Sequence, residues 1–224
     1  MRVSIVIPAL NEAAALPGTL QSLQQQMDVQ AWEVLVVDGA SSDATCTIAQ
    51  MNGAKVLHAP RGRAVQMNRG AAVSAGDVLL FLHADTRLPP DALQQLTQAI
   101  SSGYSWGRFD VQIQGQSPWL KVVGHGMNVR SRVSGIATGD QAIFVTRAAF
   151  NAVGGFPPQP LMEDIALSSQ LKRLGRPACL RARLITSGRR WEAHGIWRTI
   201  LLMWRLRLAY WCGVSPERLA TLYQ

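Results

Sequence analysis

The sequence predicts a single α/β domain with a mostly parallel central sheet flanked by helices, and three observations support this. The 224 residues are 48% hydrophobic and 16% charged, enough apolar material for a sizeable core. Short apolar runs of the kind that form buried parallel strands alternate with helical patterns through the first half. Because no internal repeat, low-complexity tract or linker is visible, one domain is the simplest interpretation.

The first half contains four apolar runs, each followed by a segment of helical pattern. The expected strands are residues 3–7, 34–37, 55–58 and 78–82, and the expected helices are residues 16–26, 41–52, 64–74 and 91–101. Pro17 stands near the start of the first helix, where proline fits, and Gly76 follows the end of the third. Short connections of this βα type predict a parallel sheet with right-handed crossovers.

The second half has a less regular pattern. The expected strands are residues 108–114, 142–145 and 178–186, and the expected helices are residues 119–132 and 162–174. The alternation of polar and apolar residues in the first of these strands is typical of a sheet edge. Gly124 and Gly126 are expected to break the helix that contains them.

Positive charge is concentrated towards the C-terminal end. The net charge is +8, and residues 172–218 contain eleven Lys or Arg against two acidic residues. Such a block favours phosphates, nucleic acid or an acidic membrane surface as partners. Residues 196–214 predict a Trp- and Leu-rich helix interrupted by arginines. This helix either lies on a membrane surface or, in the interpretation slightly favoured here, packs on the sheet or in a homodimer interface.

Cysteine usage and the N-terminal residues indicate the compartment. Cys46, Cys179 and Cys212 are odd in number and far apart, so they predict neither a disulfide framework nor a Cys-based metal site. No signal-peptide pattern is visible, and no apolar stretch has the length of a membrane span. We therefore expect a cytoplasmic protein, with the C-terminal helix as the element that would place it at the inner membrane face.

The strand expected at residues 78–82 runs into the motif His83-Ala84-Asp85. Residues that follow the carboxyl end of a parallel strand lie at the edge where open α/β sheets bind ligands. A carboxylate there, two residues from an imidazole, can hold Mg²⁺ or Mn²⁺ against a diphosphate. The alternative interpretation is that Asp85 caps the following helix or turn.

Polar residues also follow the first two expected strands. Asn11 and Glu12 follow the first strand, where they either contact a ligand or form a turn and an acidic helix start. Asp38 follows the second strand, where a carboxylate can accept from ribose hydroxyls or from the imide N–H of a base. Helix capping accounts for residues 41–43 but not for Asp38.

Three charged clusters lie further along the chain. Arg61-Gly62-Arg63 precedes a helix and suits either phosphate contact or a solvated loop. Glu163 and Asp164 open a helix, so they complement its dipole, or one of them acts as a general base. Residues 189–194 either clamp a diphosphate, with His194 as metal ligand or hydrogen-bond partner, or form a surface loop.

Several enzyme motifs are missing from the sequence. Neither of the first two expected strands is followed by Gly-x-Gly-x-x-Gly, and Gly-x-x-x-x-Gly-Lys-Ser/Thr and Gly-x-Ser-x-Gly do not occur. These absences disfavour dinucleotide dehydrogenases, P-loop enzymes and α/β-hydrolases.

Together and in this order, the segments resemble family 2 glycosyltransferases of the GT-A fold over roughly residues 2–192. The matching stretches are residues 4–12, 36–43, 61–63, 68–70, 81–85, 139–144, 153–156 and 163–164. The resemblance implies a nucleotide-binding half at residues 1–102, an acceptor and catalytic half at 103–192, and a C-terminal helical segment at 193–224. The short form is similar to a bacterial subgroup, some members of which are associated with arsenosugar biosynthesis.

The resemblance implies non-processive, inverting, metal-dependent transfer of a sugar, as in hexosyltransferases, from a nucleotide diphospho-sugar to a small-molecule or lipid-linked acceptor. Nucleic acid is not an implied partner. The implied nucleotide-binding residues are Pro8, Ala9, Asn11, Glu12, Asp38, Arg63, Asn68, His83 and Ala84. The implied ligands of Mg²⁺ or Mn²⁺ are Asp85 and His194, and the implied catalytic residues are Asp164 as base and Glu163. The implied acceptor or diphosphate residues are Gly139, Asp140, Arg190 and Trp191.

Three positions depart from the family pattern. His83 replaces the first Asp of Asp-x-Asp, which leaves the metal ligand set open, and Gly39 replaces a second Asp at the nucleotide site. Ser187 replaces the Gln of Gln-x-x-Arg-Trp, which disfavours a processive synthase.

Two rival functions stay open. A sugar-nucleotide nucleotidyltransferase has a related sheet, but its Gly-x-Gly-x-Arg loop is missing here. A non-catalytic protein that binds nucleotides or a membrane surface would bind nucleotide without metal-dependent turnover.

Overall fold

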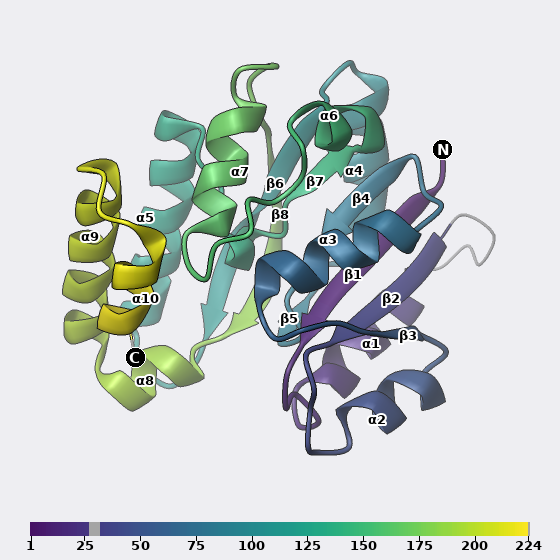
Figure 1. The fold of residues 1–224 in the computed structure, drawn as a ribbon, viewed down its shortest axis with the longest axis horizontal. Coiled ribbons are helices and arrows are strands. Elements are labelled where there is room, and N and C mark those ends of the chain that lie inside the picture. Colours follow the sequence, from purple (N-terminus) through teal and green to yellow (C-terminus); the bar gives the residue numbers. More distant parts are fainter. Residues whose placement is uncertain (27–31, 224) are drawn as a thin grey trace.

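A mixed sheet of eight strands runs through the centre of the computed structural model, which describes residues 1–26 and 32–223 (Figure 1). Residues 27–31 and 224, which belong to the expected nucleotide-binding half and C-terminal segment, lie outside this description. The strands are β1 (Val3–Ala9), β2 (Trp32–Asp38), β3 (Lys55–His58), β4 (Val78–Phe81), β5 (Thr86–Arg87), β6 (Trp106–Gln114), β7 (Phe144–Thr146) and β8 (Ala178–Ser187).

The strand order is β3-β2-β1-β4-β7-β6-β8-β5. Strand β1 pairs in parallel with β2 and β4, β2 pairs in parallel with β3, and β6 pairs in parallel with β8. Strand β7 is antiparallel to both of its neighbours, and the short β5 is antiparallel to β8. The expected α/β fold with a mostly parallel sheet is therefore confirmed.

Helices cover both faces of this sheet (Figure 1). They are α1 (Leu16–Gln24), α2 (Thr45–Met51), α3 (Arg63–Val73), α4 (Ala92–Ser101), α5 (Trp119–Ser134), α6 (Arg147–Ala152), α7 (Glu163–Leu171), α8 (Arg189–His194), α9 (Ile196–Trp211) and α10 (Pro216–Tyr223), with a 3₁₀ turn, η1 (Gly139–Gln141). None of these helices of the described chain is long and apolar enough to cross a membrane.

The two faces of β1 enter two separate cores, because successive side chains of a strand point in opposite directions. Val3, Ile5 and Ile7 pack with residues of α1 and α4 on one face. Val6 packs with residues of α3, α6 and α7 on the other face. A strand covered on both faces needs a continuous apolar sequence, which explains why the first strand was recognisable.

Two expectations about the second half were wrong. Helix α5 continues through Gly124 and Gly126 without a break. Gly124 packs against β6, where an added Cβ would lie 3.3 Å from the Val111 carbonyl oxygen, so this glycine permits close helix–sheet contact. Strand β6 is not at an edge but lies between β7 and β8. Of its polar residues, Arg108 and Asp110 are buried as an ion pair, and only Gln112 and Gln114 are exposed, so the alternation does not mark an edge.

Five further elements were not expected from the sequence, namely β5, α6, η1, α8 and α10. Helix α6 starts at Thr146, whose hydroxyl oxygen accepts a hydrogen bond from the Ala149 N–H and so caps the helix. Helix α10 packs with α9 through a small cluster that contains Leu206 and Leu219. This cluster also includes Leu161 and Met162, the two residues before α7, so it joins the C-terminal helices to the start of α7.

Candidate active site

The carboxyl ends of three parallel strands are level with one another. Ala9 at the end of β1 is in register with Asp38 of β2, and Asp38 is in register with His58 of β3. Strand β4 ends at Phe81, and His83 to Asp85 follow it directly. The topology therefore brings the ends of β1, β2 and β4 to the edge of the sheet where ligands bind in this type of fold.

An open cleft of about 820 Å³ lies at this edge. Its lining includes eleven of the residues singled out in the sequence: Pro8, Ala9, Glu12, Arg63, His83, Ala84, Asp85, Asp140, Arg190, Trp191 and His194. They come from the end of β1 and the loop after it, the loop after β4, the start of α3, η1 and α8. Residues from the two ends of the sequence are thus gathered into one cavity of ligand-binding size.

A smaller cavity of about 80 Å³ adjoins the cleft and contains Asp164 and Gly139. Arg63, His83 and Asp140 line both cavities, so the two are neighbours. One carboxylate oxygen of Asp164 accepts a hydrogen bond from the Gly139 N–H at 2.8 Å. This contact fixes the Asp164 side chain with one edge directed at the η1 turn.

The remaining candidate residues lie outside these two cavities. The Asn11 side-chain oxygen accepts from the Ser42 N–H, which ties the loop after β1 to the loop after β2. Asn68 hydrogen-bonds both the N–H and the carbonyl of Phe156, so its amide holds the loop before α7. Glu163 is buried and forms an ion pair with Arg63 at 3.0 Å.

His83 and Asp140 form a pair at the junction of the two cavities, with 3.3 Å between Nδ1 and a carboxylate oxygen. Burial acts to lower the pKa of His83, but the hydrogen bond and charge of Asp140 outweigh it and raise the pKa. Burial acts to raise the pKa of Asp140, but His83 outweighs it and lowers the pKa. Gly139 lies against the same imidazole, where any added Cβ would collide with the ring.

The carboxylate of Glu12 is a neighbour of Asp85. Burial raises the pKa of Glu12, and the negative charge of Asp85 raises it further, while Arg189 opposes the rise. Two carboxylates that face one cleft are a donor set suited to a hard divalent cation such as Mg²⁺ or Mn²⁺. His194 also lines this cleft, and its Nδ1 lies 3.1 Å from the Arg190 carbonyl oxygen. These residues have the chemistry that a divalent ion at Asp85 requires, although among the described residues the ligand atoms of Asp85, Glu12 and His194 do not form a group within 4.8 Å of one another.

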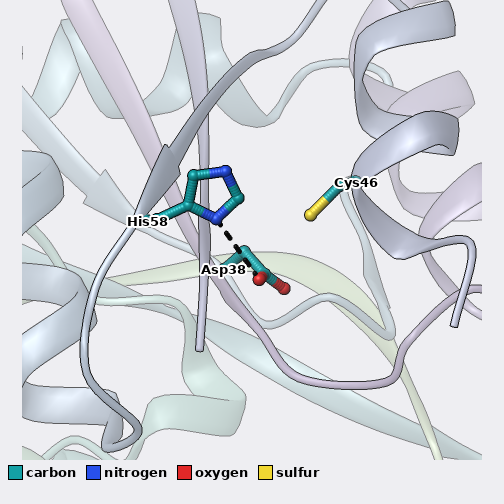
Figure 2. A group of neighbouring side chains, drawn as sticks. All are labelled: Asp38, Cys46 and His58. Atoms are coloured by element: carbon teal, nitrogen blue, oxygen red, sulfur yellow. Dashed lines mark ion pairs between the residues drawn. The ribbon is translucent and has the colours of Figure 1, made fainter. Parts of the chain in front are cut away.

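Asp38, Cys46 and His58 form another group whose potential ligand atoms lie within 4.8 Å of one another (Figure 2). Their oxygen, sulfur and nitrogen atoms would suit zinc better than magnesium. However, both Asp38 oxygens already accept backbone N–H groups, from Ala40 and Ser41. Burial and the charge of Asp38 raise the pKa of the Cys46 thiol, which disfavours the thiolate that metals bind. We therefore assign the group no metal.

Backbone strain in the described chain gathers around the same edge. The four non-glycine residues with positive φ are Asn11, Ala40, Ala142 and Met162. They lie after β1, after β2, after η1 and before α7. Such conformations cost of order 1–3 kcal/mol each and persist where the surrounding fold enforces them, commonly at ligand sites.

Some cleft residues had no signal in the sequence. Gln66 of α3 donates from its side-chain amide to the carbonyls of Ala9 and Val37, and so ties together the ends of β1 and β2. Tyr223 reaches the cleft from α10, and the Arg190 guanidinium lies 3.8 Å from the centre of its ring. Gln66 was weakly indicated in the sequence, as a polar residue inside an expected helix three residues after Arg63. Nothing in the sequence indicated Tyr223.

The fold and the cleft define an α/β protein that binds its ligand at the carboxyl ends of parallel strands. The family model for glycosyl transferase family 2 matches residues 4–152, and the chain belongs to this family. This result confirms the family expected from the sequence.

Curated relatives match part of the chain. A 4,4'-diaponeurosporenoate glycosyltransferase of Staphylococcus haemolyticus is 34% identical over 120 residues, which is 49% of this chain and 31% of the relative. An undecaprenyl-phosphate 4-deoxy-4-formamido-L-arabinose transferase of Aeromonas hydrophila is 31% identical over 112 residues, 46% of this chain and 34% of the relative. These matches span about a third of the relatives' own length.

Solved structures share the fold. S. aureus TarS 1-349 in complex with UDP has a TM-score of 0.68 and 20% identity, covering 84% of this chain and 60% of that chain. Glucosyl-3-phosphoglycerate synthase from Mycobacterium tuberculosis, in complex with Mn²⁺, UDP and phosphoglyceric acid, has a TM-score of 0.61 and 20% identity, covering 83% of this chain and 69% of that protein. The likeness confirms the expected GT-A fold.

Proposed function

We propose that this protein transfers a sugar from a nucleotide diphospho-sugar to an acceptor hydroxyl, with inversion, with a divalent metal, and one sugar at a time. One observation carries the proposal. Asp85 lines the cleft, Asp164 lines the adjoining small cavity, and Arg63, His83 and Asp140 line both. Membership of glycosyl transferase family 2 supports the same reaction.

The cleft offers contacts for each part of the donor. The loop that starts at Pro8, with Asp38 behind it, would hold the nucleoside. Arg63 and Arg190 would bind the diphosphate, because guanidinium groups match phosphate oxygens. Asp85, with Glu12 beside it and His194 across the cleft, would hold Mg²⁺ or Mn²⁺, which supplies positive charge to the departing diphosphate.

We assign the role of general base to Asp164. Its carboxylate would take the proton of the acceptor hydroxyl while the hydroxyl oxygen attacks the anomeric carbon of the donor. The bond from that carbon to the diphosphate oxygen breaks, and the nucleoside diphosphate leaves with the electron pair. The Gly139 N–H would keep Asp164 oriented, and Arg63 would offset the charge of the leaving group.

The finer assignments are proposals as well. We propose a single glycosyltransferase domain with the three parts given above, a hexosyl donor, and a small-molecule or lipid-linked acceptor without nucleic acid. The Aeromonas relative is named for undecaprenyl phosphate, which supports the lipid-linked class. A cytoplasmic location at the inner membrane face, a homodimer and a link to arsenosugar biosynthesis stay predictions.

Calorimetry and turnover together test the proposal. UDP and GDP are titrated with and without Mn²⁺, and a panel of nucleotide diphospho-sugars is then tested for hydrolysis or transfer. We expect one nucleotide to bind more tightly with metal and its sugar donor to be consumed. Binding without any turnover of the panel would favour the non-catalytic protein, and pyrophosphate-dependent exchange would favour the nucleotidyltransferase. No nucleotide binding at all would refute every version.

A further inference from the structure

An apolar groove of about 630 Å³ is lined mainly by residues of α5 and α9. Figure 1 shows these two helices at the end of the molecule away from β1, β2 and β3. Apart from Arg130, Asp140 and Arg207, every residue that lines the groove is apolar, aromatic or glycine. The proposed reaction at the cleft does not use this groove. Its size falls within the range of ordinary ligand cavities.

The sequence builds the groove from two helical stripes. On α5 the lining residues include Trp119, Val123 and Met127, four residues apart, so they share one face. On α9 the stripe runs from Ile196 to Trp211, about 22 Å along the helix at 1.5 Å per residue. The rings of Trp119 and Trp197 meet at 5.0 Å and close one end of the groove.

Exposed aromatic residues form the rim. Trp204 is 72% exposed and Trp211 is 85% exposed, although both belong to the lining of the groove. Large apolar side chains left in water in such a group indicate a surface that binds something apolar. The rim alone does not identify that ligand, but the polar residues at the base of the groove do.

Arg130 and Arg207 lie together at the base of the groove. Within the part of the chain that is described, Nε and one terminal nitrogen of Arg130 are buried without a hydrogen-bond partner. Burial and the neighbouring Arg207 lower the pKa of Arg130 to about 10. Asp140 and Asp164 offset part of the charge of both guanidiniums, but the two buried nitrogens of Arg130 still lack an acceptor among the described residues, and buried donors without an acceptor are costly, so they offer a site for an anion.

The base of the groove is continuous with the proposed active site. Asp140, Trp191 and Met203 line both the groove and the cleft. Arg207 also lines the small cavity that contains Asp164. A molecule whose apolar part lies in the groove would therefore present its polar end to the proposed base.

We propose that the groove binds the acceptor of the transfer reaction, and that this acceptor is a single-chain amphiphile with an anionic head group. Its chain lies between α5 and α9, and its anion binds Arg130 and Arg207. The inference rests on the proposed function, since it assigns the acceptor of that reaction. A second copy of the chain or a membrane surface would cover the exposed rim, whereas a single amphiphile that enters the groove also reaches the nitrogens of Arg130 that are buried.

Binding measurements distinguish the contribution of the alkyl chain of the ligand from that of its anionic head group. Dodecyl phosphate, kept below its critical micelle concentration, is titrated while tryptophan fluorescence is followed, with dodecyl maltoside and inorganic phosphate as comparison probes. We expect dodecyl phosphate to bind at least about tenfold more tightly than either comparison probe, because each lacks one of the two interactions. Equal binding of the two dodecyl compounds would overturn the anion site, and equal binding of the two phosphates would overturn the groove.

Matched variants then locate the binding site. Gly126 lines the groove, and a Cβ added there would have no atom within 4 Å. The Cβ of Gly126→Phe therefore fits without a clash, and its ring fills the groove. Val133→Phe places the same ring on α5 at a position 84% exposed and outside the groove. We expect Gly126→Phe to weaken dodecyl phosphate binding at least about tenfold and Val133→Phe to leave it unchanged. Equal affinities of the two variants would overturn the proposed location.

A second pair of variants tests the charge. Arg130→Met should weaken dodecyl phosphate about tenfold while leaving dodecyl maltoside unchanged, because it removes the charge and keeps an apolar side chain. Arg205→Met, on the exposed side of α9, is the control, and circular dichroism checks that both variants fold. Loss of affinity for both detergents to the same extent in Arg130→Met would count against an anion site.

Calorimetry of UDP with Mn²⁺ on the same samples distinguishes the two proposals. Nucleotide binding and donor turnover without amphiphile binding would refute the inference and leave the proposed function standing. Amphiphile binding without nucleotide binding or turnover would refute the proposed function, and with it the role of the amphiphile as acceptor. Dimerisation measured by light scattering that blocks amphiphile binding would assign the groove to a second copy instead.

Discussion

Arg63 Nε lies 3.0 Å from a carboxylate oxygen of Glu163, which joins the first residue of α3 to the first residue of α7. The sequence suggested separate roles for these two residues, nucleotide binding for one and catalysis for the other. Burial raises the pKa of Glu163, and the charge of Arg63 opposes that rise. The pair therefore fixes the guanidinium beside Asp164 and links the two neighbouring cavities.

Replacing Glu163 by Gln tests this positioning role. The variant keeps the shape of the side chain but removes its charge, so Arg63 loses its partner. Because burial raises the pKa of Glu163, its charge does not by itself stabilise the fold at neutral pH, so we expect the free energy of unfolding to change by less than about 1 kcal/mol. We also expect lower kcat in donor turnover. Glu217→Gln, on exposed α10, is the control, and unchanged kcat in Glu163→Gln would argue against the pair as a positioning device.

Asp164→Asn tests the proposed base. The amide can still accept from the Gly139 N–H but cannot take a proton from the acceptor. We expect transfer to fall by about 10²–10⁴-fold, the usual contribution of general-base catalysis, with little change in nucleotide affinity. Single-turnover assays and calorimetry measure the two quantities. Undiminished transfer would remove Asp164 as the base, and Asp91→Asn at an exposed position controls for the loss of charge.

Asp85→Asn tests the metal site. Removing one carboxylate next to Glu12 should weaken the proposed divalent site, so more Mn²⁺ would be needed for half-maximal turnover. We expect this concentration to rise by about tenfold or more, and chelation of metal in the wild type to abolish turnover. Metal titration of activity measures the change. An unaltered Mn²⁺ requirement in Asp85→Asn would assign the ion to other residues.

Glu33 gives a prediction about acid stability away from the site. Burial acts to raise its pKa, but hydrogen bonds from the Ser4 hydroxyl and the Ala75 N–H outweigh it and lower the pKa below 4.5. A lowered carboxyl pKa contributes stability above the unfolded value, and this contribution disappears as the pH falls through the folded pKa. We expect Glu33→Gln to lose about 1–2 kcal/mol at pH 7 and less as the pH falls below about 4.5.

Urea unfolding at a series of pH values measures this difference. Glu217→Gln serves again as the exposed control. A Glu33→Gln deficit that stays constant down to pH 3 would show that lost packing, and not the charge of Glu33, accounts for it.

The strand ends of the first half were predictable because buried parallel strands have continuous apolar sequences, as in β1 and β4. Pro8 and Ala9 at the end of β1, and His83 to Asp85 after β4, lie in the cleft because the carboxyl ends of parallel strands meet at one edge of the sheet. Helix α5 was not predictable as a continuous element. Glycine has a low helix propensity, so Gly124 predicts a break, but this glycine permits the close contact between α5 and β6. Local preference and tertiary packing favour different outcomes at this position.

The sequence by itself determined the α/β class, the family and the strand-end carboxylates, because apolar period and motif order are local properties of the chain. The tertiary structure alone decided which distant residues meet. It paired Arg63 with Glu163, placed Tyr223 in the cleft and set Arg130 beside Arg207 at the base of the apolar groove. These contacts depend on how α5, α7, α9 and α10 pack against one another, and packing between helices far apart in the chain leaves no short-range pattern in the sequence.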